Sequence, residues 1–139
     1  MKKPLLFIGM LVFTFAPLIS RGQVINEIMY DLEDSDTING KSREWIELYN
    51  KSSHEIDLTG WKFNDGDNAT NHTLYAPPDH GGQGSMVIPT AGYVVIAEDA
   101  ATFLADHSGF GGAVIDAAAM NFKDASSTVT TLKIITPDE

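Results

Sequence analysis

Apolar and polar residues alternate with a period of two in several short stretches of the chain, which predicts β-strands separated by polar turns. In the clearest stretch, Arg43–Asn50, Ile46 and Leu48 share one face. The opposite face is half polar and begins with Trp45. We predict that this strand lies at the centre of an antiparallel sheet, with Ile46 and Leu48 in the core and Trp45 packed as a large aromatic side chain.

The next stretch, Glu55–Asp65, follows a short polar link, KSSH, which is typical of a hairpin or a tight loop, and the two stretches are predicted to pair at the centre of the antiparallel sheet. Its apolar positions change parity at Gly60, after which Trp61 and Phe63 become the apolar pair. A slip of one residue turns every side chain of a strand over, and a glycine bulge can absorb it. We therefore predict a bulge at Gly60 that returns Trp61 and Phe63 to the core.

Three other parts of the chain predict further strands. Val24–Tyr30 has apolar residues on both faces, which is typical of a covered strand. Thr90-Ala91-Gly92 links Met86–Pro89 to Tyr93–Ala97 as a predicted hairpin with a left-handed glycine. Ser127–Ile135, rich in β-branched residues, is the last predicted strand.

One short helix is predicted between Asp99, which can cap it, and Gly109, which can end it. Its apolar face, at helical spacing, consists of Ala100, Phe103, Leu104 and His107. We expect this helix to cover one end of a sandwich. Together the elements predict an all-β, immunoglobulin-like β-sandwich with one short helix.

The N-terminus has the pattern of a secretory signal peptide. Two lysines precede an apolar run at positions 5–19, which is shorter than the roughly 20 residues of a membrane-spanning helix. Cleavage is expected between Gly22 and Gln23, so residues 1–22 are predicted to be the signal peptide and residues 23–139 the domain. An uncleaved membrane anchor is the alternative. The chain has no cysteine, which excludes disulfides and a lipoprotein anchor.

The charge balance is strongly acidic. The whole chain has 9 basic and 19 acidic residues, and 3 of the basic ones lie in the predicted signal peptide. The remaining 6 basic and 19 acidic residues give a net charge of −13 for the exported part. Such a surface repels nucleic-acid phosphates and anionic lipids. We therefore expect a secreted or cell-surface protein with no nucleic-acid partner and no stable membrane span after removal of the signal.

Four motifs resemble the lamin-tail domain of the exported bacterial kind: VINEIMY, EWIELYN, IDLTGWKFND, and IPTAGYVVIAED running into ATFLADHSGF. The resemblance extends from about Val24 to Ile135. It implies an immunoglobulin-like sandwich and a non-catalytic module, often an appendage of larger secreted proteins such as nucleases, phosphatases and cell-surface proteins. In animal lamins the related domain follows a filament rod and binds proteins and chromatin. Nothing in this sequence resembles that rod.

The resemblance also implies a missing element. Domains of this kind continue past the equivalent of Ile135 with a glycine-centred turn and one further strand, whereas this sequence stops at Glu139. We therefore expect residues 23–139 to be a C-terminally truncated sandwich that lacks its last strand. An open sheet edge of that kind can pair with another chain.

Candidate metal and catalytic residues are few. The acidic loop at positions 31–42 can hold Ca²⁺ with its carboxylates, although it does not match the EF-hand pattern and a solvated loop is the favoured interpretation. Its acidic residues are Asp31, Glu33, Asp34 and Asp36. No histidine pair has a metal-ligand spacing, and His80 is the histidine whose loop best suits catalysis. We expect no catalytic residue and no cofactor other than Ca²⁺.

Trp45, Tyr49 and Trp61 can form an aromatic sugar-binding platform, although packing inside the fold is the favoured interpretation. Three functions follow from these observations. The leading hypothesis is a secreted, non-enzymatic binding or adhesion module for an extracellular protein or glycan. The alternatives are an accessory domain of an extracellular hydrolase whose active site lies elsewhere, and a Ca²⁺-dependent carbohydrate-binding module.

Overall fold

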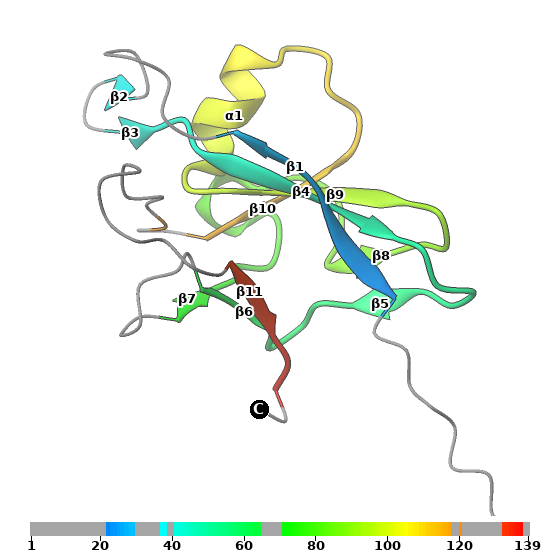
Figure 1. Cartoon of the computed structure of the whole chain (residues 1–139). Coiled ribbons are helices and arrows are strands. Elements are labelled where there is room, and N and C mark those ends of the chain that lie inside the picture. Colours follow the sequence, from blue (N-terminus) through cyan, green and yellow to red (C-terminus); the bar gives the residue numbers. More distant parts are fainter. Residues whose placement is uncertain are drawn as a thin grey trace, which may run out of the picture.

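The computed structural model describes residues 22–29, 37–38, 41–64, 71–117, 120 and 132–137. In these residues the chain forms short strands, one 3₁₀ turn and one helix (Figure 1). Their bounds are β1 Gln23–Met29, β2 Thr37–Ile38, β3 Lys41–Ser42, β4 Trp45–Asn50, β5 Ile56–Asp57, β6 Lys62–Asn64, β7 His72–Thr73, η1 Asp79–Gly81, β8 Val87–Ile88, β9 Tyr93–Ala97, α1 Ala100–Asp106, β10 Ala113–Asp116 and β11 Lys133–Ile135.

The largest sheet has four strands in the order β1-β4-β9-β10. β4 pairs antiparallel with both β1 and β9, so it is central, as its sequence pattern predicts. Its burial alternates strictly, with Ile46, Leu48 and Asn50 fully buried on the inner face. β9 and β10 run parallel and are joined through α1, a crossover that the alternating pattern did not predict.

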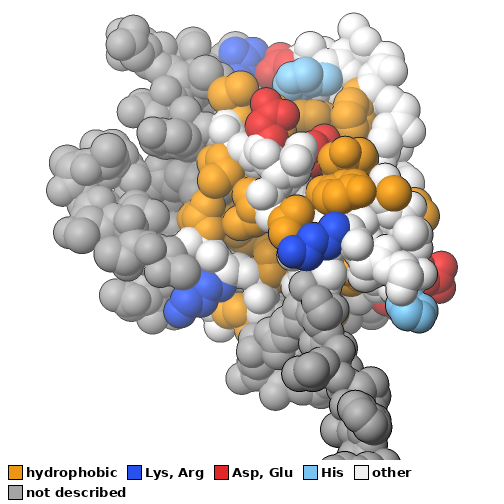
Figure 2. All heavy atoms as spheres, turned by 45° about the vertical axis from the view of Figure 1, so that its right-hand side comes forward, with side chains coloured by type: hydrophobic (Ala, Val, Ile, Leu, Met, Phe, Trp, Pro, Cys, Tyr) orange, Lys and Arg blue, Asp and Glu red, His pale blue; other side chains and the backbone are white. Residues whose placement is uncertain are grey.

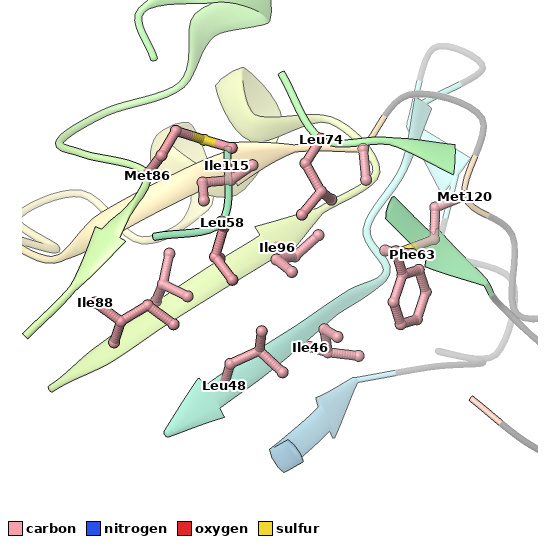
Figure 3. Packing of buried hydrophobic residues seen from close by; sticks show 12 residues of the cluster. Ile46, Leu48, Leu58, Phe63, Leu74, Met86, Ile88, Ile96, Ile115 and Met120 are labelled. Carbon is pink, nitrogen blue, oxygen red and sulfur yellow. The ribbon is translucent and has the colours of Figure 1, made fainter. Parts of the chain in front are cut away.

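The main core lies between this sheet and a second layer formed by β5 with β8 and by β11, β6 and β7 (Figure 1). Figure 3 shows the packing: side chains of the second layer point toward those of the large sheet. The fully buried members of this core include Ile46, Leu48, Leu58, Phe63, Ile88, Ile96, Ile115 and Met120. Two packed β-layers around one core confirm the predicted all-β, immunoglobulin-like sandwich.

Helix α1 packs on the opposite face of the large sheet, not over one end of the sandwich as the sequence suggested (Figure 1). Ala100 and Phe103 are buried against Val95 and Val114 of β9 and β10. The predicted cap is present, because the Asp99 side chain accepts a hydrogen bond from the Thr102 N–H at 2.7 Å. The protein therefore has a small second core outside the sandwich.

The two predicted hairpins are wrong. β5 pairs with β8, not with β4, so the link KSSH passes from one layer to the other. β8 and β9 likewise belong to different sheets, and the turn between them has Ala91, not Gly92, in the left-handed conformation, with φ 56°. In both places a short link joins the layers because each strand finds its hydrogen-bonding partner elsewhere in the chain.

The predicted bulge at Gly60 is also wrong. The Trp61 N–H donates to the Leu58 carbonyl at 3.0 Å, and Gly60 has φ +77°, so this stretch is a tight turn between β5 and β6. The turn has the predicted effect on side chains, since Leu58 and Phe63 are both fully buried. A register shift occurs in β1 instead, between Ile25 and Glu27.

Strand β1 lies at one edge of the large sheet. Its exposed side chains correct the expectation of a strand covered on both faces. Ile28 is 42% exposed, and Asn26 and Glu27 are exposed as well. At the other end of the chain, β11 pairs with β6, and the remainder of the predicted Ser127–Ile135 strand lies outside the described residues. None of the helices in the described ranges has the length and apolar character that crossing a bilayer requires.

Candidate functional site

The structure leaves the predicted calcium site untested. Asp31, Glu33, Asp34 and Asp36 lie outside the described residues. Within the described ranges, no three histidine, aspartate or glutamate side chains are grouped so that they could hold a metal ion. The candidate site described below therefore consists of other side chains.

A cavity of about 240 Å³ opens between the start of β4, the end of β9 and helix α1. Three elements of the fold meet here because Glu98, just after β9, donates its backbone N–H to the Glu44 carbonyl at 3.1 Å. The cavity is lined by Met29, Arg43, Glu44, Trp45, Ala97, Asp99, Phe103, Asp106 and His107. Its lining combines an apolar floor with charged groups, which is the usual composition of a small-ligand site.

An ion pair closes one side of this cavity. Arg43 Nη2 donates to Asp106 Oδ1 at 3.0 Å, and Arg43 Nε lies 2.8 Å from Asp106 Oδ2. The pair joins the start of β4 to the last residue of α1, so it connects segments 63 residues apart. Because both side chains are partly exposed, we expect it to contribute little to stability. Its clearer consequence is that the Arg43 charge is neutralised locally.

Three aromatic rings that line the cavity contact one another. Trp45 meets Phe103 edge-to-face, with ring centroids 5.6 Å apart, and meets His107 in the same way at 6.3 Å. His107 stacks on Phe103 at 4.3 Å, and its Nδ1 lies 2.9 Å from the Phe103 carbonyl. The helical spacing of Phe103 and His107 predicts their common face, but the sequence contains no signal that Trp45 would join them.

Glu44 is a buried acidic residue among those that line the cavity. Glu44 is only 6% exposed, although it directly precedes a strand whose outer face is half solvated. Fully buried acidic side chains are rare unless they are paired. The sequence contains no signal that Glu44 would be buried beside α1.

The aromatic platform, the less favoured interpretation of Trp45, Tyr49 and Trp61, does not form. Trp45 packs in the outer cluster with α1, whereas Trp61 is partly buried against the main core. Tyr49 instead contacts Tyr93, its cross-strand neighbour on β9, with ring centroids 4.8 Å apart. Figure 2 shows hydrophobic side chains gathered on the face that comes forward there, with basic, acidic and histidine side chains together at its upper end.

His80 lies in a second, smaller cluster. Its ring stacks on Tyr75 at 3.8 Å, and its Nδ1 is 3.8 Å from Oδ1 of the buried Asp116. The other Asp116 oxygen accepts the Ala100 N–H at 3.0 Å, at the start of α1. This arrangement holds the loop at positions 76–84 near the helix and favours a structural role for His80.

Asn50 has a structural role that the sequence pattern does not predict. Its Nδ2 donates to the carbonyls of His54 and Ile88, at 2.8 and 3.0 Å, while its Oδ1 accepts from the Ser52 N–H at 2.9 Å. Asn50 begins a glycosylation sequon, but its side chain is fully buried. The sequon is therefore inaccessible in the folded protein.

The fold and the cavity define an immunoglobulin-like module with a small depression outside its main core. The profile of the Lamin Tail Domain family matches residues 21–134. Since the match covers well over half of the chain, this protein belongs to the lamin tail domain family. Searches among curated proteins and solved structures gave no match.

Proposed function

We propose that this lamin tail domain is a non-catalytic binding module, secreted or held at the cell surface as an appendage of a larger extracellular protein. The observation that carries the proposal is the cavity between β4 and α1, whose lining groups come from three separate elements and lie outside the main core. A depression of this kind can change its side chains without loss of the sandwich. The acidic net charge supports a partner other than nucleic acid.

Binding is tested by titrating a collection of small polar and aromatic fragments into the ¹⁵N-labelled protein. We expect the amide signals that shift to cluster at Trp45, Ala97 and Phe103. Shifts scattered over the molecule, or confined to the second layer of the sandwich, would contradict a binding role for the cavity. An assay of hydrolase activity on phosphoester substrates provides the complementary test, and activity that survives purification would contradict the non-catalytic part of the proposal.

Export is tested separately by N-terminal sequencing of the chain recovered outside the cell. The basic start and the apolar run at positions 5–19 support cleavage after Gly22, which leaves Gln23 as the first residue. In the structure the Gly22 carbonyl, just before β1, accepts the Lys51 N–H at 2.7 Å. Cleavage after Gly22 would remove this acceptor from the Lys51 N–H, which follows β4. Recovery of Met1 on the exported chain would contradict the proposal.

A further inference from the structure

We propose that the cavity between β4 and α1 binds the side chain of a lysine from a partner protein. The inference rests on the proposed binding function and specifies the chemistry of its ligand. It depends on three properties of the cavity, which are its size, its charge and its aromatic lining.

The volume of the cavity suits a single side chain. Sites for drug-sized ligands usually measure about 300–1,000 Å³. At about 240 Å³ this cavity falls below that range, so a whole cofactor or oligosaccharide ring system does not fit inside it. The butylammonium group of lysine has five heavy atoms, and its methylene part matches the apolar floor of Met29, Ala97 and Phe103.

The charge of the cavity favours a cation. Its described lining contains three acidic residues, Glu44, Asp99 and Asp106, against one guanidinium, Arg43, so these four residues have a formal charge of 1 − 3 = −2. Arg43 faces the Asp106 carboxylate with two nitrogens and is thereby neutralised toward an anionic ligand. The whole chain has a net charge of −10, which adds to the attraction of a cation.

The aromatic lining adds a second attraction for the same kind of group. Ammonium ions are attracted to the faces of aromatic rings within about 6 Å, and Trp is the strongest partner. Trp45, Phe103 and His107 contact one another in the lining, so a cation that enters the cavity lies near all three rings. A hydrated metal ion makes less use of such a lining than an alkylammonium group does.

The binding experiment compares three probes on the full-length protein: Nα-acetyl-lysine methylamide, its norleucine analogue without charge, and its glutamate analogue with the opposite charge. The indole N–H signal of Trp45 reports binding, and Trp61 serves as the internal control because it lies in the other core. We expect the lysine probe to shift Trp45 but not Trp61, to bind at least about tenfold more tightly than the other two, and to weaken as salt is added.

Two substitutions sharpen the test. Glu44→Gln removes a buried carboxylate and is expected to lower the affinity for the lysine probe about tenfold. Asp106→Asn removes one carboxylate from the lining and weakens the ion pair with Arg43 at a partly exposed position, so this variant should remain folded, lose affinity for lysine and gain affinity for the glutamate probe. Glu55→Gln is the matched control, because Glu55 is exposed and does not line the cavity. This variant should bind the lysine probe as the parent does.

Each remaining outcome contradicts the proposal. If the norleucine or glutamate probe shifts Trp45 as strongly as the lysine probe does, the ligand is not a cation, although the cavity remains a binding site and the proposed function stands. If no probe shifts Trp45, the lysine assignment fails, and the fragment titration then decides the proposed function independently. Unchanged lysine binding by a folded Asp106→Asn variant would contradict the proposal that the carboxylates of the lining attract the lysine ammonium group.

Discussion

The two faces of the four-stranded sheet differ in what covers them. On the inner face Ile46, Leu48 and Ile96 are fully buried, and the second layer of the sandwich packs on them along their length. On the outer face α1 covers the part near Val95, whereas Tyr93 is 50% exposed. Both faces belong to the same strands, so the difference lies in the elements that pack on them.

The difference shows where this fold can carry function. A closely packed face tolerates few changes, since even one methylene more or less costs stability. The outer face is only partly covered, and the cavity lies where the cover of α1 ends. The side chains of Trp45 and of α1 that line the cavity can therefore change while the sandwich remains intact.

The largest expected effect comes from removing the ring of Phe63, which is fully buried in the main core. Phe63→Ala should lower the free energy of unfolding by about 3–5 kcal/mol, because it leaves a cavity that the core cannot refill. Tyr93→Ala on the outer face should cost less than about 1 kcal/mol. Urea denaturation of both variants checks the pair, and equal losses would abolish the distinction between the two faces.

Removal of the Asn50 side chain should have the next largest effect. Asn50→Ala leaves the buried Ile88 carbonyl and other backbone groups without their partner, and each such group costs about 1–3 kcal/mol. We expect a loss of about 2 kcal/mol or more in chemical denaturation. Asn26→Ala is the matched control, since Asn26 is exposed and donates one bond to Glu47. A similar loss in both variants would contradict a central role for Asn50.

A substitution in the turn at Gly60 is expected to lower the free energy of unfolding by less. Gly60→Ala forces a side chain into the left-handed region, with a loss of about 1–2 kcal/mol. A Cβ built there lies 3.4 Å from Pro137 Cγ, an ordinary contact, so backbone strain is the cause. Gly111→Ala should be near neutral, because no atom lies within 4 Å of its added Cβ. Thermal melting compares the two, and a Gly60→Ala protein as stable as the parent would argue against the turn.

Substitution of Asp99, the residue that caps α1, tests the stability of the helix on the outer face of the sheet. Asp99→Ala should cost about 1 kcal/mol, since the Thr102 N–H in the first turn of the helix loses its side-chain acceptor. Asp99→Asn retains an oxygen acceptor and should be close to the parent. The difference is measured by thermal unfolding, together with amide exchange in α1. If Asp99→Asn loses as much as Asp99→Ala, the carboxylate charge is responsible and not the cap.

The smallest effect is expected from the exposed Asp57. Hydrogen bonds from the Thr59 side chain and from its backbone N–H lower the pKa of this carboxyl from its usual value of 3.8. A lowered folded-state pKa stabilises the protein above the unfolded-state pKa, and this stabilisation is lost as the pH falls through the folded-state value. At neutral pH the free energy of unfolding of the parent should therefore be higher than that of Asp57→Asn by a few tenths of a kcal/mol. The advantage should vanish in acid, and growth of the advantage in acid would contradict this account.

The sequence by itself determined which side of β4 and of β6 faces the core and where the helix begins. Ile46, Leu48 and Phe63 lie where the period of two places them, and Asp99 caps α1. These features depend on neighbours within about four residues, so the local pattern contains them. The motifs of the sequence also indicated the family.

The pairing of strands was decided by the tertiary structure. A link such as KSSH is short enough for a hairpin, and equally short links join two layers. Here Asn50 binds the carbonyls of both His54 and Ile88, which directs the chain from β4 into the second layer. The crossover through α1 then brings Phe103 and Asp106 beside Arg43 and Trp45. The cavity depends on contacts between residues about sixty positions apart, and no local pattern specifies them.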